Sequence, residues 1–224
     1  VGYNQQMSLL NLPKPFFVLA PMDDVTDTVF RRVVAMAAAP DLYFTEFVNV
    51  DGLQSPGRPK LLPKLAYTAA EQPIIAQLWG KTPENYYKSA KDIVAMGFAG
   101  VDINMGCPAK PIVQNGCCSA LINNRDLAVE IIQATQRGVT EALREQGREA
   151  EIGHFPVSVK TRLGWNEVDF TWHELLLKQK LNMLTIHGRT KKEMSKVPAN
   201  WDAIGHIARL RTSLAPDTLI VGNG

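Results

Sequence analysis

Short apolar runs, each ending in glycine or a polar residue, recur along the whole chain. Apolar side chains between these runs recur at helical spacing, so strands and helices alternate. The seven runs with the length and composition of buried parallel strands are residues 16–22, 42–47, 74–80, 100–106, 156–164, 183–189 and 218–224. The pattern therefore predicts an α/β chain.

Two of the intervening helices have recognisable ends. One is expected to begin after Thr82, an N-cap residue followed by proline, and to end at Gly97. The longest begins near Asn124 and ends in the charged run 144–151, which we expect to be a solvated face.

The number of strands favours a (β/α)8 TIM barrel. A doubly wound sheet is less favoured because no Gly-x-Gly-x-x-Gly fingerprint follows the first strand. An eighth strand has no counterpart, and a barrel without it leaves two parallel edges unpaired. We therefore expect residues 1–224 to form one TIM-barrel catalytic domain, truncated after the seventh strand.

The composition is that of an ordinary globular protein. The chain has 224 residues, of which 46% are hydrophobic and 21% are charged. A formal net charge of +2 does not by itself indicate a nucleic-acid partner. There is no apolar run of the roughly 18 residues that a membrane span needs, and no signal-peptide pattern. Three cysteines cannot all pair in one chain, so we expect a cytoplasmic protein without membrane contact.

Residues 104–110 place a single thiol on a tight turn directly after an apolar strand. Free cysteines are usually inert packing groups, so one interpretation of Cys107 is structural. The flanking Gly106 and Pro108 turn the chain sharply, which suits a displayed side chain better than a packed one. Catalytic groups collect at the carboxyl ends of strands in α/β proteins, so a catalytic role is favoured.

Other polar side chains lie at the ends of the predicted strands. Lys160 belongs to an alternating strand, where an ammonium that faces an apolar barrel is costly unless it meets a negative charge; a solvated lysine is the alternative. His187 is either a hydrogen-bonded core group or a ligand contact. Gln77 offers both a donor and an acceptor. Together they predict a ligand site at the barrel mouth.

Basic residues gather after two of the strands. They are Arg58, Lys60 and Lys64 after the second strand, and Arg189, Lys191, Lys192 and Lys196 after the sixth. Such runs are usually solvated faces. Here both would lie on the same rim, where they favour a phosphate-bearing substrate such as RNA.

The adjacent pair Cys117 and Cys118 does not indicate a metal. Zinc sites need four ligands at recognisable spacing, and these two thiols with scattered histidines do not provide them. No metal is therefore expected.

Five segments in the same order at successive strand ends carry a family resemblance: Ala20-Pro21-Met22 and residues 104–110, 159–162, 187–190 and 222–224. Together they closely resemble the tRNA dihydrouridine synthases, flavoenzymes that reduce uridine in tRNA. Single pieces are weak signals, but their order along residues 16–224 is specific. The family usually has small residues where this chain has Cys117 and Cys118.

The resemblance implies an FMN-dependent reduction of a specific tRNA uridine to 5,6-dihydrouridine, with NADPH as the reductant. Hydride from reduced flavin would go to C6 of uracil, and a proton from Cys107 would go to C5. An unperturbed thiol, with a pKa near ~8.5, is mostly protonated at neutral pH and suits this role. The family's C-terminal tRNA-docking helical domain has no counterpart in the sequence.

The resemblance also assigns the residues of the site. Cys107 is expected to be catalytic, and Asn104 and Arg162 are expected to hold the target base. The residues expected to bind the cofactor are Ala20, Pro21, Met22, Gln77, Lys160, His187, Asn223 and Gly224.

Two other functions are compatible with these residues. The first is an FMN-dependent reductase of a free pyrimidine or small enone, which would use the same lysine and cysteine. The second is a non-catalytic tRNA-binding module. The sequence makes no prediction of the oligomeric state.

Overall fold

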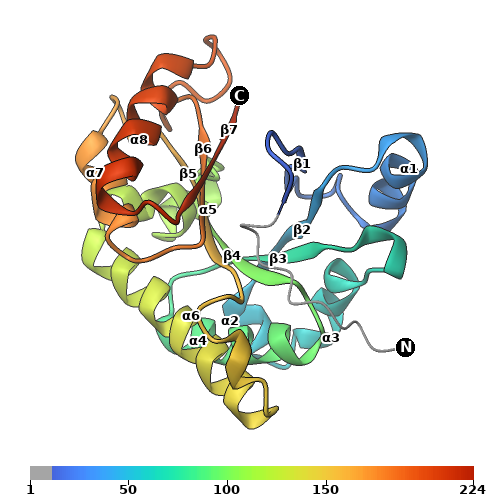
Figure 1. The fold of residues 1–224 in the computed structure, drawn as a ribbon. Coiled ribbons are helices and arrows are strands. Elements are labelled where there is room, and N and C mark those ends of the chain that lie inside the picture. Colours follow the sequence, from blue (N-terminus) through green and yellow to red (C-terminus); the bar gives the residue numbers. More distant parts are fainter. Residues whose placement is uncertain (1–11) are drawn as a thin grey trace.

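A single parallel sheet of seven strands organises the computed structural model, which describes residues 12–224 (Figure 1). The strands are β1 (Val18–Leu19), β2 (Leu42–Asn49), β3 (Ile74–Trp79), β4 (Gly100–Met105), β5 (Val157–Arg162), β6 (Met183–His187) and β7 (Leu219–Asn223). Each strand pairs with the next one along the chain. The seven predicted strands are confirmed, although β1 is only two residues long.

Helices connect the strands in the predicted alternation. The α-helices are α1 (Thr28–Ala38), α2 (Val50–Leu53), α3 (Arg58–Leu61), α4 (Pro83–Ala95), α5 (Lys110–Gln114), α6 (Arg125–Glu145), α7 (Phe170–Leu177) and α8 (Trp201–Leu214). The 3-10 helices are η2 (Leu62–Leu65), η3 (Ala69–Glu71), η4 (Cys118–Asn123) and η5 (Glu149–Glu151). As predicted, α4 ends just before Gly97, whose φ of +79° suits glycine, and α6 begins directly after Asn124.

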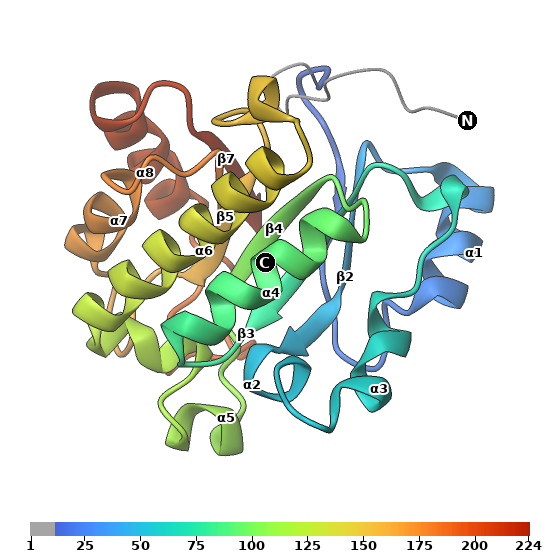
Figure 2. The same cartoon turned by 90° about the horizontal axis from the view of Figure 1, so that it is seen from below.

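The sheet curls into an open half-barrel with helices on its outer face (Figure 1, Figure 2). Helices α4 and α6 lie side by side outside the sheet. Gly138 of α6 comes so close to α4 that a Cβ there would lie 2.3 Å from the Tyr87 carbonyl oxygen. Strands β1 and β7 form the two edges of the sheet. The arrangement confirms an incomplete TIM barrel.

Side chains inside the curl change from apolar to polar along the strands. Near the amino ends, a small apolar cluster consists of Leu42, Phe44, Ile75, Met183 and Leu219. Further along, the register sets Gln77 beside Asp102, and Asp102 beside Ser158. The larger apolar core, which includes Ile103 and Ile131, contains residues of both the sheet and the surrounding helices. Polar groups are therefore concentrated toward the carboxyl ends of the strands.

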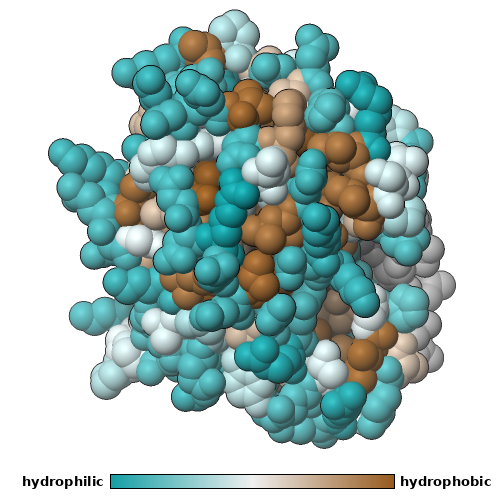
Figure 3. Space-filling view, turned by 90° about the vertical axis from the view of Figure 1, so that its left-hand side faces the viewer, coloured by the Kyte–Doolittle hydropathy of each residue, from teal (hydrophilic) through white to brown (hydrophobic). Residues whose placement is uncertain are grey.

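The outer surface is mixed in character. On the face seen in Figure 3, hydrophobic residues lie among hydrophilic ones. Every helix within residues 12–224 is either too short or too polar to cross a bilayer.

A fully buried ion pair holds α1 to the molecule. Arg31 Nε lies 2.7 Å from Glu71 Oε1, and neither side chain has any exposed surface. The guanidinium also donates to the carbonyl oxygens of Thr26 and Ala66, at 2.6 Å each. The second carboxylate oxygen of Glu71 accepts from the backbone and hydroxyl of Thr68. Every charge is therefore paired and hydrogen-bonded, which is the condition for burying ions without a large penalty.

Replacing Glu71 with alanine would leave the Arg31 guanidinium buried without its counter-ion. We expect Glu71→Ala to lower the free energy of unfolding by about 3–5 kcal/mol. Urea denaturation followed by circular dichroism measures this. Lys88→Ala, which removes the exposed ion pair with Glu84, serves as the control and should leave the midpoint near that of the parent. Equal midpoints for both variants would contradict a stabilising role for the buried pair.

Candidate active site

The carboxyl ends of the seven strands meet at one rim, because all the strands are parallel. The register aligns the polar side chains of neighbouring strands there. Asn104 of β4 pairs with Lys160 of β5, Arg162 pairs with His187 of β6, and His187 pairs with Asn223 of β7. The structure thus brings five of the predicted site residues together in two adjacent layers.

The turn that carries Cys107 is held from two sides. Asn104 Oδ1 accepts hydrogen bonds from the N–H groups of Gly106 and Cys107, at 3.0 and 2.9 Å. Arg162 Nε donates to the carbonyl oxygen of Gly106 at 2.7 Å. A Cβ on Gly106 would lie 3.3 Å from the backbone of Thr161, so glycine allows this close approach. Asn104 and Arg162, which were expected to hold a substrate base, position the cysteine turn in this structure.

The sulfur of Cys107 is half-buried and lies among groups that favour its anion. The neighbouring Cys118 thiol, with smaller contributions from the Ala109 N–H and the charge of Arg162, outweighs the effect of burial and lowers the pKa of Cys107 to about 6. The surroundings of Cys107 in the structure therefore favour the thiolate more than those of the unperturbed thiol that the sequence analysis assumed.

A buried carboxylate behind the turn was missed by the sequence analysis. Asp102 is completely buried; it accepts from Gln77 Nε2 at 2.6 Å and from Ser158 Oγ at 2.5 Å. Burial raises its pKa to about 6 against the opposing effect of these hydrogen bonds. The signal in the sequence was a charged residue inside the apolar strand that precedes Asn104.

Gln77 is committed to the same group of side chains. Its amide nitrogen donates to Asp102, and its carbonyl oxygen accepts from Asn104 Nδ2 at 3.0 Å. These two bonds leave one amide hydrogen and one lone pair of Gln77 for a further partner. The residue is completely buried. A chain of hydrogen bonds thus runs from Ser158 through Asp102 and Gln77 to Asn104, which shapes the Cys107 turn.

Lys160 is a cation without a hydrogen-bonding partner. Among residues 12–224, its ammonium makes neither a hydrogen bond nor an ion pair. Burial lowers its pKa to about 8, the negative charge of Asp102 opposes this, and the charge of Arg162 adds to it. An unpaired and largely desolvated cation favours an anionic ligand, as the sequence predicted.

His187 is neutral, and its tautomer is defined by Arg189. The Nη1 atom of Arg189 lies 3.0 Å from His187 Nε2. A guanidinium only donates, so Nε2 is assigned as the acceptor and Nδ1 carries the hydrogen. Burial, with the charges of Arg162 and Lys160, lowers the pKa of His187 to about 4. The ring therefore offers a neutral N–H donor.

Asn223, which pairs with His187 in the sheet, has a buried side-chain oxygen without a hydrogen-bond partner. Its backbone carbonyl accepts from the N–H of Gly188 at 2.8 Å. The adjacent Gly224 has a φ of +153° and approaches Ala199 closely. Buried polar atoms without partners are rare in proteins, so this one indicates a place where a ligand donor fits.

Ala20, Pro21 and Met22 follow β1 at the same rim. The N–H of Met22 donates to Thr26 Oγ1, and its carbonyl accepts from Thr26, so this backbone is already used. The Met22 side chain is 41% exposed. The backbone of Met22 is therefore used within its own turn, while its side chain is accessible to a ligand.

Of the two basic runs predicted for the rim, the one after β2 is largely paired with acidic side chains. Lys64 pairs with Asp23 at 2.5 Å, Asp24 at 3.2 Å and Glu46 at 3.1 Å. Arg58 likewise pairs with Asp92. The residues after β2 are thus largely neutralised, because acidic side chains from other parts of the chain fold against them.

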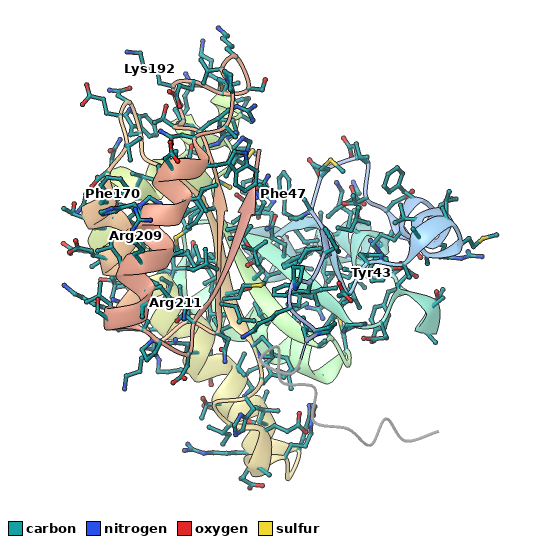
Figure 4. The ribbon with its side chains drawn as sticks, turned by 45° about the horizontal axis from the view of Figure 1, so that its top comes forward. Tyr43, Phe47, Phe170, Lys192, Arg209 and Arg211 are labelled. Atoms are coloured by element: carbon teal, nitrogen blue, oxygen red, sulfur yellow. The ribbon has the colours of Figure 1, made fainter. Side chains whose placement is uncertain are left out.

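The loop after β6 keeps its positive charge. Its backbone is tied to the loop after β5, since the N–H groups of Lys191 and Lys192 donate to the carbonyls of Gly164 and Trp165 at 2.9 Å each. The Lys191 ammonium lies 4.5 Å from the centre of the Trp165 ring. Lys192 projects from this loop beyond the end of β6 (Figure 4). We call Trp165, Lys191 and Lys192 the ledge; it is the cationic part of the rim.

Comparison with known proteins identifies the family of this chain. The family model "Dihydrouridine synthase (Dus)" matches residues 18–224. The chain is 48% identical over 217 residues to "Probable tRNA-dihydrouridine synthase 2" of Bacillus subtilis (strain 168), covering 95% of this chain and 62% of that protein. It is 45% identical to "Probable tRNA-dihydrouridine synthase" of Staphylococcus aureus (strain COL), covering 95% of this chain and 61% of that protein.

The chain therefore spans less than two thirds of the length of these relatives. Among solved structures, morphinone reductase in complex with tetrahydroNAD shares the fold, with a TM-score of 0.50, 12% identity, and coverage of 92% of this chain and 82% of that chain. The family model and the relatives show that this chain belongs to the dihydrouridine synthase family.

Proposed function

We propose that this chain is the catalytic barrel of an enzyme that reduces a specific uridine of tRNA to 5,6-dihydrouridine, with FMN as cofactor and NADPH as reductant. The observation that carries the proposal is the acidic thiol of Cys107, held on a rigid turn beside an unpaired lysine at the barrel mouth. The relatives named as probable tRNA-dihydrouridine synthases support it.

The residues at the mouth fit a flavin. Lys160 would pair with the electron-rich edge of the ring, which gains negative charge on reduction. The Nδ1–H of His187 would donate to the cofactor, and the orphaned side-chain oxygen of Asn223 would accept from it. Ala20, Pro21, Met22, Gln77 and Gly224 would line the remaining surface. When bound, FMN would supply the hydride that reaches C6 of uracil.

Cys107 would supply the proton. After hydride transfer, the electrons of the uracil C5=C6 bond form an enolate-like anion, and C5 takes the proton from the Cys107 S–H. The bonding pair stays on sulfur as a thiolate, beside the Ala109 N–H and the Arg162 charge. The thiol must carry its proton at this moment. The negative charge of the substrate anion favours that state because a neighbouring like charge raises the pKa of an acid.

Arg162 and Asn104 would hold the base. The Nε and Nη1 atoms of Arg162 already donate to the carbonyl oxygens of Gly106, Thr190 and Met194, which leaves Nη2 for a uracil carbonyl. Asn104 retains one amide hydrogen. A base must leave its stack to reach such a site.

The ledge formed by Trp165, Lys191 and Lys192 would contact the tRNA backbone, since exposed cations attract phosphates. The three cysteines are free thiols, which fits a reducing compartment, so we place the reaction in the cytoplasm.

The direct test incubates the purified protein with FMN, NADPH and unmodified tRNA, and measures dihydrouridine by mass spectrometry of the nucleosides. Free uridine and a small enone are the alternative substrates. Formation of dihydrouridine in tRNA is the expected result. Reduction of only the small substrates, or the absence of any bound flavin, would overturn the proposal.

Replacing Cys107 with alanine should separate the two halves of the reaction. Cys107→Ala is expected to retain FMN and to oxidise NADPH, but to form dihydrouridine about 10²–10⁴-fold more slowly, because only the proton donor is lost. Rapid-reaction absorbance and nucleoside analysis measure the two steps. Cys117→Ala is the control, since that buried thiol contacts the Asn115 carbonyl instead. Equal losses in the two variants would count against Cys107 as the acid.

Replacing Lys160 with methionine removes the charge while keeping an unbranched side chain. Lys160→Met should weaken FMN binding about 10–150-fold and slow flavin reduction, since a charged hydrogen bond contributes roughly 1.5–3 kcal/mol. Fluorescence titration of FMN measures the affinity. Lys192→Met, at an exposed lysine of the same rim, should bind FMN like the parent. Parent-like flavin reduction by Lys160→Met would make Lys160 structural.

The lowered pKa of Lys160 also predicts a pH dependence. The ammonium is charged below its pKa of about 8 and neutral above it. At roughly pH 6.5 to 7.5, below the pKa of Lys160, FMN affinity should therefore be nearly constant. It should fall as the pH rises through about 8, where the ammonium loses its charge. The Lys160→Met variant should lack this decline. A parent and variant with parallel profiles would assign the titration to another group.

A further inference from the structure

Strand β2 contains a β-bulge close to the candidate site. Its register with β3 shifts between Phe44 and Phe47, so the two residues between them face a single residue of β3. The hydroxyl of Thr45 stabilises the bulge, because it accepts from the Gln77 N–H at 3.1 Å and donates to the Glu46 carbonyl at 2.6 Å. Bulges beside active sites commonly redirect a side chain.

The side chain that this bulge redirects is that of Phe47. Phe44 belongs to the apolar cluster inside the curl, and side chains alternate between the two faces of a strand. In a regular strand Phe47, three residues further on, would therefore face outward. The extra residue instead pairs Phe47 with Gln77, whose amide is hydrogen-bonded to Asp102 and Asn104 inside the curl. Phe47 thus turns inward, as Figure 4 shows.

The Phe47 ring is not taken up by the core. It is only partly buried, although it follows a run of buried residues in β2. Within residues 12–224 it belongs to neither apolar cluster and takes no part in the two ring contacts. An inward-facing aromatic side chain normally joins the core, so this ring presents apolar surface to the mouth of the curl.

The polar groups at the mouth leave the faces of a flat ligand without partners. Lys160, His187 and Asn223 offer a charge, a donor and an acceptor, and such groups recognise the edges of a ring system. A tricyclic flavin also has two broad apolar faces, which are stabilised by apolar or aromatic contact. Phe47 supplies surface of this kind.

The position of Phe47 favours the flavin over the uracil base. Strand β2 pairs with β1, which leads into the segment that ends at Met22, and with β3, which carries Gln77. Asn104 and Arg162 lie further along the sheet, on β4 and β5, where they hold the turn of Cys107. Phe47 therefore lies on the side of the mouth that is assigned above to the cofactor.

We propose that Phe47 is a flavin-binding residue, whose ring packs against the isoalloxazine ring of FMN, and that the β2 bulge brings it there. The identity of the ligand rests on the proposed function. Phe47 lies outside the five segments that carry the family resemblance, and only the register of β2 places it at the site.

Fluorine NMR tests the contact without turnover. The purified protein is labelled with para-fluorophenylalanine, and the Phe47 resonance is assigned by its loss in Phe47→Leu. Added FMN should shift this resonance, because the ring current of the flavin acts on nuclei that lie against it. Phe170, whose ring stacks on His206 at 4.2 Å between α7 and α8, is the matched control and should keep its resonance.

FMN affinity, measured by absorbance titration, gives a second readout. Phe47→Ala should weaken binding about 10–100-fold, the range for the burial of one aromatic side chain. Phe47→Leu keeps part of the apolar surface and should lose less, and Phe170→Leu should bind FMN like the parent. Circular dichroism verifies that each variant is folded.

The part played by the bulge has its own pair of variants. Thr45→Val removes the hydroxyl that accepts from Gln77 and should weaken FMN binding, whereas Thr45→Ser keeps the hydroxyl and should restore it. Parent-like affinity in Thr45→Val would overturn the role given to the bulge.

An unmoved Phe47 resonance in protein that binds FMN, or parent-like affinity in Phe47→Ala, would overturn the proposal while the proposed function stands. If FMN shifts the Phe47 resonance but tRNA is not reduced, the Phe47 contact stands and the proposed function fails. If the parent binds no FMN, both are wrong.

Discussion

The buried carboxylate of Asp102 is the constraint on which the arrangement of the site depends. A charge inside a barrel is tolerated only when hydrogen bonds and opposite charges surround it. Here Ser158 and Gln77 donate to it, and Lys160 lies close enough for their charges to interact. Because Gln77 is held by Asp102, it can accept from Asn104, and Asn104 in turn holds the backbone of the Cys107 turn.

Charges at the barrel mouth act on one another. Arg162 favours the Cys107 thiolate and disfavours the charged forms of Lys160 and His187. Its guanidinium is itself held by the carbonyls of Gly106, Thr190 and Met194, and so links β5 to the loops after β4 and β6. The result is a rim with an acidic thiol, a neutral histidine and a lysine whose pKa lies near physiological pH. Groups with such perturbed pKa values cluster at functional sites.

Attachment of the loops explains why only one half of the rim remains cationic. The loop after β6 is joined to the loop after β5 by backbone hydrogen bonds, and none of the ion pairs within residues 12–224 involves its lysines. Lys64, after β2, instead meets three carboxylates, two of them from the turn after β1. Counting lysines along a chain therefore overstates the positive charge of a surface when acidic residues distant in sequence fold against them.

The sequence by itself determined the α/β class, the seven strands and the carboxyl edge at which the candidate residues lie, because apolar periodicity and strand-end glycines are local properties and parallel strands share one carboxyl edge. It also indicated Cys107 and Lys160, whose chemistry is unusual in their local setting. Only the tertiary structure decided what surrounds them: that Cys118 lies against Cys107, that Asp102 supports Gln77, that Arg189 orients His187, and that Lys64 is neutralised. These depend on contacts between segments far apart in the chain, and the pKa of a group is determined by such contacts and by burial, neither of which local sequence contains.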